Sequence, residues 1–241
     1  MNHQFLNFIF SHGDLVQMIL FVSLFFISWT IENIYGVFFN YRKWKHAFIN
    51  APFIITNLPG QLLLGVAFVG VIRWTSIHHF GLLYSFHIEK NHVLLFLTTF
   101  ILLDFGEYIY HVFMHKTKTL WRFHLVHHSD KIVDISTTLR EHPAENLIRL
   151  SFTLLWIFFT GAIFWAILLR QIIQVFTTMF AHINYRLPEK MDIIIGCIFI
   201  TPNLHQVHHH YQMPYTNCNY GDVFSFWDRL LEHSKSYPAR I

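Results

Sequence analysis

Histidine is the residue type whose number and spacing in this chain point most clearly to chemistry. The 241-residue sequence contains 19 histidines, and eight of them form three groups with helical spacing. Positions i and i+4, or i, i+3 and i+4, project from the same face of a helix, so each group can direct its imidazoles at one point. The groups are His111 and His115; His124, His127 and His128; and His205, His208 and His209.

Metal binding is the chemistry that these groups predict. The pattern H-x-x-H-H occurs twice, whereas a chain of this histidine content would contain it by chance about 0.1 times. Clustered imidazoles repel one another once protonated, and a metal ion would organise them. Eight imidazoles are more than one ion accepts, so we expect two ions. Zinc, copper, iron and nickel all bind neutral imidazole, and the residues alone do not choose among them.

Apolar helices are the elements that must position these groups. Hydrophobic residues make up 54% of the chain and charged residues 13%, which is typical of a protein embedded in a bilayer. Three uncharged runs are each long enough, with helical continuation, to cross a hydrocarbon core of ~30 Å. They are Leu15–Ile31, which can extend towards Phe39; Ala47–Ile72, with a kink expected at Pro59-Gly60; and Val93–Leu103, which continues through His111 and His115.

Residues 147–182 contain two further apolar runs around Arg170. The roughly 36 residues supply ~54 Å of helix, whereas a round trip across the bilayer needs ~60 Å. We therefore expect a tilted or shallow helical hairpin that does not fully cross the bilayer twice, with Arg170 snorkelling or paired.

The chain then divides into four segments that form one functional domain. Residues 1–115 hold three transmembrane helices and end in the first histidine motif, 116–146 form a histidine-rich helical segment, 147–182 form the hairpin, and 183–241 form a cap with the last motif. The predicted fold is an all-α integral membrane protein with about four transmembrane helices and a cytoplasmic helical cap that holds a poly-histidine dimetal site.

Basic residues set the predicted orientation. One group follows the first span and another follows the third: Arg42, Lys43 and Lys45, then Lys116, Lys118, Arg122, Lys131, Arg140 and Arg149. Both groups fall on one side of an alternating topology, and the excess of Lys and Arg marks that side as cytoplasmic. We expect a multi-pass protein with its active site on the cytoplasmic side, and with an N-terminus that is outside and retained.

Depth and composition narrow the class of function. His111 follows Val93 by 18 positions, or ~27 Å of helix, which places it near the edge of the hydrocarbon layer. An enzyme acting on a lipid suits this depth better than a transporter does. Basic residues do not alternate with stacking aromatics outside the apolar segments, so we expect no nucleic-acid binding. Two cysteines are too few for a disulfide framework or a thiolate metal site.

The spaced motifs resemble the fatty acid hydroxylase and sterol desaturase superfamily of membrane di-iron oxygenases. The resemblance covers residues 104–229. Its motifs are Asp104 and Tyr108 before H-x-x-x-H; Trp121 before the first H-x-x-H-H; Arg140, His142, Pro143 and Glu145; His182 with Asn184; Thr201-Pro202 before the second H-x-x-H-H; Asn219-Tyr220-Gly221; and Trp227-Asp228-Arg229. Departures at Val112, Asn217 and Leu231-Glu232 leave every ligand position in place.

The resemblance implies an activity and its cofactors. It adds His182 as a ninth ligand and implies two iron ions, with zinc possible in isolated protein, and O2 as co-substrate. The implied enzyme is a hydroxylase or desaturase that acts on a C–H bond of a sterol, fatty acyl or related lipid from the bilayer. Electrons would come from a separate donor protein, because no G-x-G-x-x-G fingerprint for a flavin or nicotinamide is present.

Two other classes of function compete with this interpretation. A zinc-dependent membrane hydrolase or a metal-handling membrane protein could use the same ligands without redox chemistry. The H-E-x-x-H signature of zinc proteases is absent, which counts against the commonest hydrolase. An inactive relative that serves as a scaffold is disfavoured because no ligand position is lost.

Five residues are predicted to support the ligands: Asp104, Tyr108, His142, Asn184 and Asn219. Asp104 lies two helical turns before His111, and a buried carboxylate there could accept the second N–H of a ligand imidazole. Glu107 competes for that role or faces Lys or Arg, and Tyr108 could simply pack. His142 and Glu145 could support the site or cap the fourth helix. His210 is expected to point away from the last cluster and is not counted as a ligand. The four outer-loop histidines are expected to face solvent: His78, His79, His87 and His92.

Overall fold

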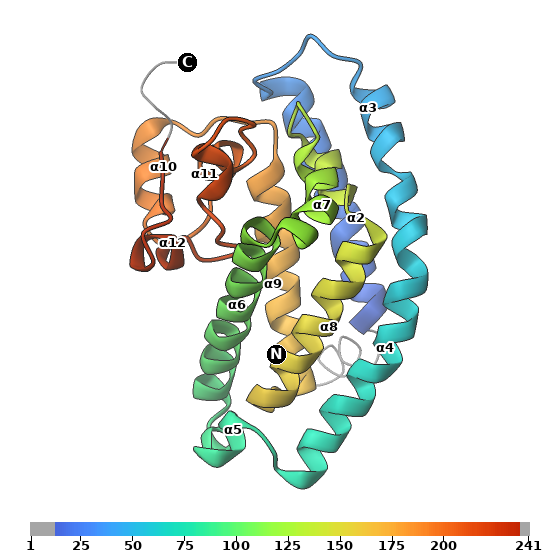
Figure 1. Cartoon of the computed structure of the whole chain (residues 1–241), viewed down its shortest axis with the longest axis vertical. Helices are drawn as coiled ribbons and strands as arrows, with labels where there is room; N and C mark the ends of the chain where they lie inside the picture. Colours follow the sequence, from blue (N-terminus) through green and yellow to red (C-terminus); the bar gives the residue numbers. More distant parts are fainter. Residues whose placement is uncertain (1–12, 237–241) are drawn as a thin grey trace.

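The computed structural model of the chain describes residues 13–236, and its elements there are helical (Figure 1). Five long helices form a bundle: α2 (Gly13–Tyr35), α4 (Pro52–His78), α6 (His92–Lys116), α8 (Pro143–Thr160) and α9 (Phe164–His182). Four stretches of the described chain are long and apolar enough to cross a membrane: Met18–Tyr35, Lys43–Ser85, His92–Lys116 and Phe164–His182. The predicted all-α membrane fold with about four spans is therefore confirmed.

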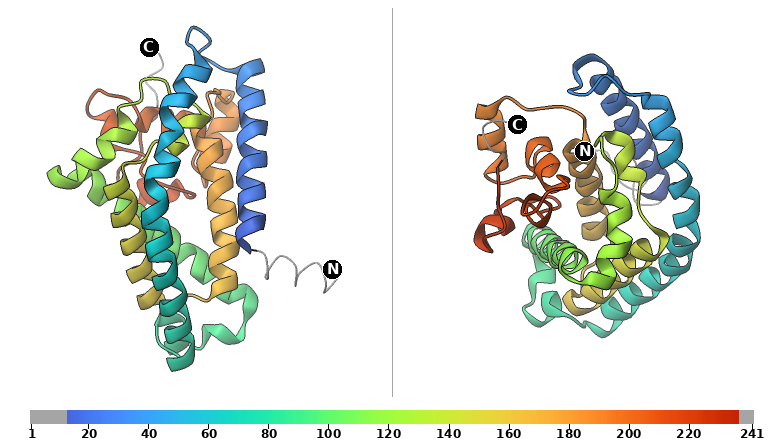
Figure 2. Two further views of the ribbon diagram at one scale, coloured as in Figure 1. Left: turned by 90° about the vertical axis from the view of Figure 1, so that its right-hand side faces the viewer. Right: turned by 45° about the horizontal axis from the view of Figure 1, so that its top comes forward.

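Shorter helices complete the chain at the ends of the bundle. They are α3 (Lys43–Asn50), α5 (Leu82–Ser85), α7 (Lys118–His128), α10 (Glu189–Gly196), α11 (Pro202–His208) and α12 (Phe226–Leu230), together with three 3-10 turns, η1 (Ile88–Lys90), η2 (Ile135–Leu139) and η3 (Tyr215–Asn217). Helices α10, α11 and α12 lie beside the upper part of α6 and α9, and α7 crosses the same end of the bundle (Figures 1 and 2). This end carries all the histidine motifs.

Pairwise packing explains how the bundle holds together. Helix α4 packs along α8, α2 packs on α9, and α6 contacts both α8 and α9. The helix of α4 runs through Pro59 and continues past the predicted end at Ile72 to His78. Gly60 lies where α4 approaches α8, because a Cβ there would come within 2.9 Å of the Leu147 side chain. The Pro59-Gly60 pair thus marks a close helix contact.

Residues 147–182 form the predicted helical hairpin. Its turn contains Gly161, which has a φ of 70° and packs against Gly81, where the chain turns after α4. A side chain at either glycine would meet the backbone around the other. The depth of this hairpin in a bilayer stays a prediction, whereas the predicted pairing of Arg170 is confirmed, since its Nη1 donates to Gln174 and its Nη2 lies 3.7 Å from an oxygen of Asp222.

A buried carboxylate ties the first helix to the histidine-bearing end. Glu32 of α2 accepts hydrogen bonds at 2.7 Å from the backbone N–H groups of Ile135 and Asn184, and its second oxygen lies 2.9 Å from Lys43 Nζ. The charge is thereby paired and hydrogen-bonded, as a carboxylate removed from water requires. Glu32 therefore fixes the backbone two residues beyond His182.

Candidate metal centre

The structure brings the nine predicted ligands together in two adjacent groups. The first cluster contains His111, His115, His124, His128 and His208, and the second cluster contains His127, His182, His205 and His209. Within each cluster one ring nitrogen of every histidine lies within 4.8 Å of the others. Imidazole rings of the two clusters also touch, since the His128 and His209 ring centroids are 4.5 Å apart.

Each cluster is assembled from three helices, which are α6, α7 and α11 for the first and α7, α9 and α11 for the second. Helix α7 supplies both clusters because His124 and His128, four residues apart, lie on one side and His127 lies on the next face. Helix α11 does the same, with His208 in the first cluster and His205 and His209 in the second. The two H-x-x-H-H motifs therefore have matching roles, each bridging the clusters.

Hydrogen bonds at the outer nitrogen orient five of the rings. The Nδ1–H of His111 donates to the carbonyl of Tyr220 at 2.8 Å, and that of His208 to the carbonyl of Cys218 at 2.7 Å. In the same way His127 donates to Arg140, His182 to Thr178, and His124 to the carboxylate of Glu145. Each bond leaves Nε2 as an unprotonated lone pair that points into a cluster.

Facing lone pairs are what make the clusters fit metal ions. Nε2 of His111 lies 3.1 Å from Nε2 of His124, and Nε2 of His127 lies 3.2 Å from Nε2 of His182. With the proton of each ring already on Nδ1, neither pair can form a hydrogen bond, and the contact would be repulsive without a cation. Two nitrogens bound at ~2.1 Å to one ion at about a right angle lie ~3 Å apart, which matches these separations.

Unpartnered nitrogens support the same assignment. Both ring nitrogens of His115 and His128, and Nε2 of His208, are buried and have no hydrogen-bond partner within residues 13–236. Buried polar atoms in proteins are nearly always satisfied, so an unsatisfied group needs an explanation. Coordination of a metal ion would satisfy one nitrogen of each of these rings.

Protonation of these rings is suppressed in the fold. Burial, and after it the neighbouring imidazoles, holds the pKa of His128, His208 and His209 well below the ordinary 6.5. The pKa values of His124, His127 and His205 are lowered in the same way. The rings are therefore neutral at neutral pH, which is the form that binds metals.

The structure separates the roles of His142 and Glu145, which the sequence left open. His142 is the N-cap of α8, where its Nδ1 accepts from the backbone N–H of Ala144 at 3.0 Å. Glu145 supports the metal centre, because its Oε1 lies 2.5 Å from Nδ1 of His124 and both side chains are buried. His142 therefore takes the capping role, which was one of the two roles that the sequence allowed.

Asp104 and Tyr108 also support the site differently from what was predicted. Asp104 accepts from the backbone N–H of Val223 at 3.1 Å and from Trp227 Nε1 at 2.8 Å, so its partners are in the C-terminal segment and not on a ligand imidazole. The Tyr108 hydroxyl lies 2.6 Å from Nδ1 of His233. Glu107 accepts from Thr153 at 2.8 Å. These side chains fasten the cap and α8 to α6.

The two asparagines hold loops beside the ligands. Asn184 accepts from the backbone of Val37 and Phe38 and donates to Phe38, which secures the chain just after His182. Asn219, with a φ of 53°, donates to the carbonyls of Leu204 and Lys235. Neither asparagine bonds a ligand ring through these contacts, so both position backbone.

The loop at Cys218–Gly221 was not recognised from the sequence as a direct partner of the ligands. Asp228 accepts from the backbone N–H groups of Tyr220 and Gly221 at 2.7 and 2.9 Å, and so fixes the loop whose carbonyls orient His111 and His208. A Cβ at Gly221 would lie 2.4 Å from the Phe224 carbonyl, so only glycine fits. Asp228 of the W-D-R motif thus holds the N-Y-G loop in place.

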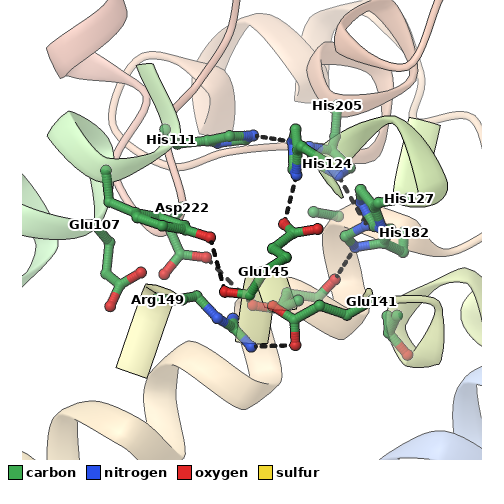
Figure 3. A pocket seen from close by; sticks show the side chains of 15 residues that line it. Glu107, His111, His124, His127, Glu141, Glu145, Arg149, His182, His205 and Asp222 are labelled. Carbon is green, nitrogen blue, oxygen red and sulfur yellow. Dashed lines mark hydrogen bonds and ion pairs between the residues drawn. The ribbon is translucent and has the colours of Figure 1, made fainter. Parts of the chain in front are cut away.

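A cavity of about 120 Å³ adjoins both clusters (Figure 3). Imidazoles of His111, His124, His127, His182 and His205 line one side of it. Charged side chains line the other: Glu107, Glu141, Glu145, Arg149 and Asp222. The cavity borders the nitrogens at which the two clusters could hold metal ions.

Other histidines lie outside the two clusters, as predicted. His78, His79, His87 and His92 are exposed. His210 is partly exposed, and its Nδ1 accepts from the backbone N–H of Gln212. His46 is a further histidine in a buried polar network, where it bridges Asp130 at 2.7 Å and Asp134 at 2.9 Å. No local pattern singles out His46, because its partners are 84 and 88 residues away in the chain.

The known proteins that this chain is similar to include two whose names describe lipid oxidation. The chain is 30% identical over 131 residues to an ornithine lipid hydroxylase of Rhizobium tropici, a match that covers 54% of this chain and 39% of that protein. It is 27% identical over 137 residues to an alkylglycerol monooxygenase of Danio rerio, covering 55% of this chain and 28% of the relative. The chain therefore spans well under half the length of these two relatives.

A longer match is to a very-long-chain aldehyde decarbonylase of Oryza sativa subsp. indica. It is 27% identical over 195 residues and covers 80% of this chain and 66% of the relative. No solved structure matches the chain significantly.

The sequence model of the fatty acid hydroxylase family matches residues 96–233. This match covers more than half of the chain and includes all nine clustered histidines, Glu145 and the loop that Asp228 fixes. The chain belongs to the fatty acid hydroxylase family.

Proposed function

We propose that this protein oxidises a C–H bond of a membrane lipid, using O2 and two iron ions held by the nine clustered histidines. The observation that carries the proposal is the pair of imidazole clusters whose unprotonated nitrogens face one another beside a cavity. The relatives support it, since they are named as a lipid hydroxylase, an alkylglycerol monooxygenase and an aldehyde decarbonylase. Iron suits imidazole ligands, and its redox chemistry reaches C–H bonds that acid–base side chains do not.

The side chains and backbone around the clusters would hold the ions in a fixed, dry site. Glu145 and the carbonyls of Tyr220 and Cys218 keep three rings of the first cluster in the tautomer that binds metal. The carbonyls of Arg140 and Thr178 do the same for two rings of the second cluster. Burial of the ligands excludes bulk water, which protects a reactive centre from side reactions.

The chemistry supplied by bound iron would be activation of O2. In a hydroxylation one oxygen atom enters the C–H bond, and the other leaves as water after taking up two protons and two electrons. The electrons would come from a separate one-electron donor protein, which is oxidised. We place this exchange on the cytoplasmic side, because the basic residues next to the histidine motifs favour that orientation.

Oxygen consumption tests this function directly. Protein purified with iron in lipid nanodiscs, with a reduced ferredoxin as electron donor, should consume O2 in a way that depends on added lipid extract and yields a hydroxylated or desaturated lipid. His115→Ala and His205→Ala, one from each cluster, should each abolish the reaction. His78→Ala, at an exposed histidine, is the matched control and should keep it. Lipid turnover that continues without O2, or in both cluster variants, would contradict the proposal.

A further inference from the structure

The cavity beside the clusters extends from the imidazoles along α6 into one leaflet of the bilayer. Glu107 lines it and stands nine residues before Lys116, where α6 ends. Nine residues of helix correspond to ~14 Å, which is about the thickness of one leaflet of the hydrocarbon core, so the cavity lies within the leaflet on the side of the histidine motifs. Its other walls come from the first turns of α8 and the last turns of α9.

The wall that faces the imidazoles is strongly charged (Figure 3). Four carboxylates line it, whereas two arginines are near: Arg149 Nη2 lies 2.8 Å from Glu141, and Arg170 Nη2 lies 3.7 Å from Asp222. Glu107 and Glu145 have no cationic Lys or Arg partner within ion-pair distance among the residues that the structure describes. The wall therefore contains carboxylate oxygens that can accept further hydrogen bonds.

Two side chains in this wall still have hydrogen-bonding capacity. Glu145 is only 4% exposed, and its Oε2 has no partner in the described part of the chain. The side chain of Arg149 is 39% exposed although the residue lies between helices, so its guanidinium borders open space. One group offers an acceptor and the other offers donors. A ligand with both kinds of polar group would satisfy them.

An apolar chain would fit this wall poorly. Methylene groups packed against these carboxylates and the guanidinium would remove them from water without replacing their hydrogen bonds, which is unfavourable for each group left unsatisfied. Hydroxyl or ammonium groups would donate to the carboxylates, and an ester, ether or phosphate oxygen would accept from Arg149. The chemistry of the wall thus favours a polar head group.

The size of the cavity excludes bulky rings. A water molecule needs ~10–15 Å³ of such volume, so about 120 Å³ holds on the order of ten small groups. Pockets for drug-sized ligands occupy ~300–1,000 Å³. A compact head group fits this space, whereas a fused ring system does not.

We propose that the substrate is a lipid with a compact head group bearing hydroxyl or amine donors, and that it is oxidised at a carbon on or next to this head group. Arg149, Glu107 and Glu145 bind the head group beside the ions while the acyl chain stays in the bilayer. This inference rests on the proposed function and narrows its substrate class.

Binding to zinc-loaded protein tests the inference without turnover. The full chain in nanodiscs is loaded with zinc, and bound lipid is measured by native mass spectrometry. The probes share one chain length: monooleoylglycerol supplies hydroxyls, oleoyl lysophosphatidylethanolamine supplies an amine, and 1-octadecene has no head group; cholesterol supplies a fused ring. At least one of the two lipids with head groups should bind about tenfold or more tightly than octadecene and cholesterol.

Variants of the wall link this preference to the named residues. Arg149→Met and Glu107→Gln should each weaken binding of the preferred lipid about tenfold while two zinc ions per chain are retained. Arg73→Met, at an exposed arginine of α4, is the matched control and should leave binding unchanged. Equal binding of octadecene or cholesterol, or unchanged binding in both wall variants, would overturn the inference. A protein that binds these lipids but never consumes O2 would contradict only the proposed function.

Discussion

At the scale of single residues, Glu145 has the most direct influence on a ligand. Its carboxylate accepts a hydrogen bond from Nδ1–H of His124, and this bond leaves the lone pair on Nε2 of that ring free in the first cluster. Carboxylates that hold a ligand imidazole in this way raise its basicity and fix its orientation. Glu145 therefore determines whether His124 is available as a ligand.

Substitution of Glu145 should weaken the first cluster specifically. Glu145→Ala is expected to lower the metal affinity of that cluster about 10–100-fold, because His124 loses the acceptor that fixes its tautomer. Glu145→Gln keeps an acceptor oxygen and should retain most of the affinity. Metal content measured after competition with a graded chelator would give both values.

Glu141→Gln is the matched control for this experiment. Glu141 lines the same cavity, but its carboxylate pairs with Arg149 and Asn146 and touches no ligand imidazole. Its substitution should leave both ions bound. Equal metal loss in the Glu141 and Glu145 variants would show that general disturbance of the cavity, and not the bond to His124, is responsible.

Ligands could be predicted from the sequence better than the groups that orient them. The helical spacing of His124, His127 and His128 indicates a shared target, whatever the rest of the fold does. The acceptors of His111 and His208 are carbonyls of Tyr220 and Cys218. Every residue has a carbonyl, so no residue type signals this role. The partner of Asp104 was predicted incorrectly. Its spacing from His111 shows which face of the helix it lies on, but not which segment packs against that face.

At the scale of elements, a buried carboxylate helps to fasten the C-terminal cap to α6. Asp104 accepts from the backbone of Val223 and from the Trp227 indole, and the adjacent Asp228 fixes the loop that orients His111 and His208. The cap thus contributes to the metal centre through its own attachment to the bundle.

Asp104→Asn should loosen this attachment. The amide replaces one acceptor oxygen with an N–H₂ donor that faces another donor, so we expect a loss of about 1–3 kcal/mol in the free energy of unfolding. Limited proteolysis should then cleave the cap after residue 196 faster than in the wild type. Trp227→Phe, which removes the indole donor, should produce a milder version of the same change. A cap that resists protease equally in all three proteins would contradict this role.

The polar network around His46 attaches α3 to the segment after α7. Burial alone would raise the pKa of Asp134, but hydrogen bonds from His46, Ser136 and Tyr41 outweigh burial and hold this pKa below the ordinary 3.8. A carboxyl whose pKa is lowered by folding stabilises the fold above its unfolded pKa, and this stabilisation is lost as the pH falls through the folded pKa.

Asp134→Asn should therefore make the free energy of unfolding depend less on pH in the acid range. The wild type should be more stable than the variant near neutral pH, and the difference should shrink as the pH falls from about 5 to about 3. Thermal unfolding in nanodiscs across this range would measure it. Glu189→Gln, at an exposed carboxylate, is the control and should give no such trend. A difference that is constant with pH would show that the carboxylate charge is not responsible.

The course of the helices was predictable where apolar runs are long and was less so at their ends. The apolar run that forms most of α4 was evident in the sequence. The helix continues past Ile72 to His78, because Arg73 and the residues after it are compatible with helix. The hairpin of 147–182 was expected, and its turn depends on two glycines, Gly81 and Gly161, in separate parts of the chain. Such a contact between distant turns has no local signature.

At the scale of the whole molecule, the bundle and the cap form the two halves of one metal centre. Helices α6 and α9 rise from the apolar bundle and end in His115 and His182, while α7 and α11 close over them with the two H-x-x-H-H motifs (Figure 1). Neither half contains a complete cluster. The metal centre therefore depends on the association of membrane helices with polar segments, some of which are adjacent in sequence and some of which are distant.

Metal analysis of the purified full-length chain tests the central claim most directly. Protein from cells grown with iron should contain two iron ions per chain. His127→Ala combined with His209→Ala should reduce this to one, because the five ligands of the first cluster remain. A folded wild-type chain that contains no metal or only one ion, or a double variant that still holds two, would contradict the assignment of the nine histidines to two metal sites.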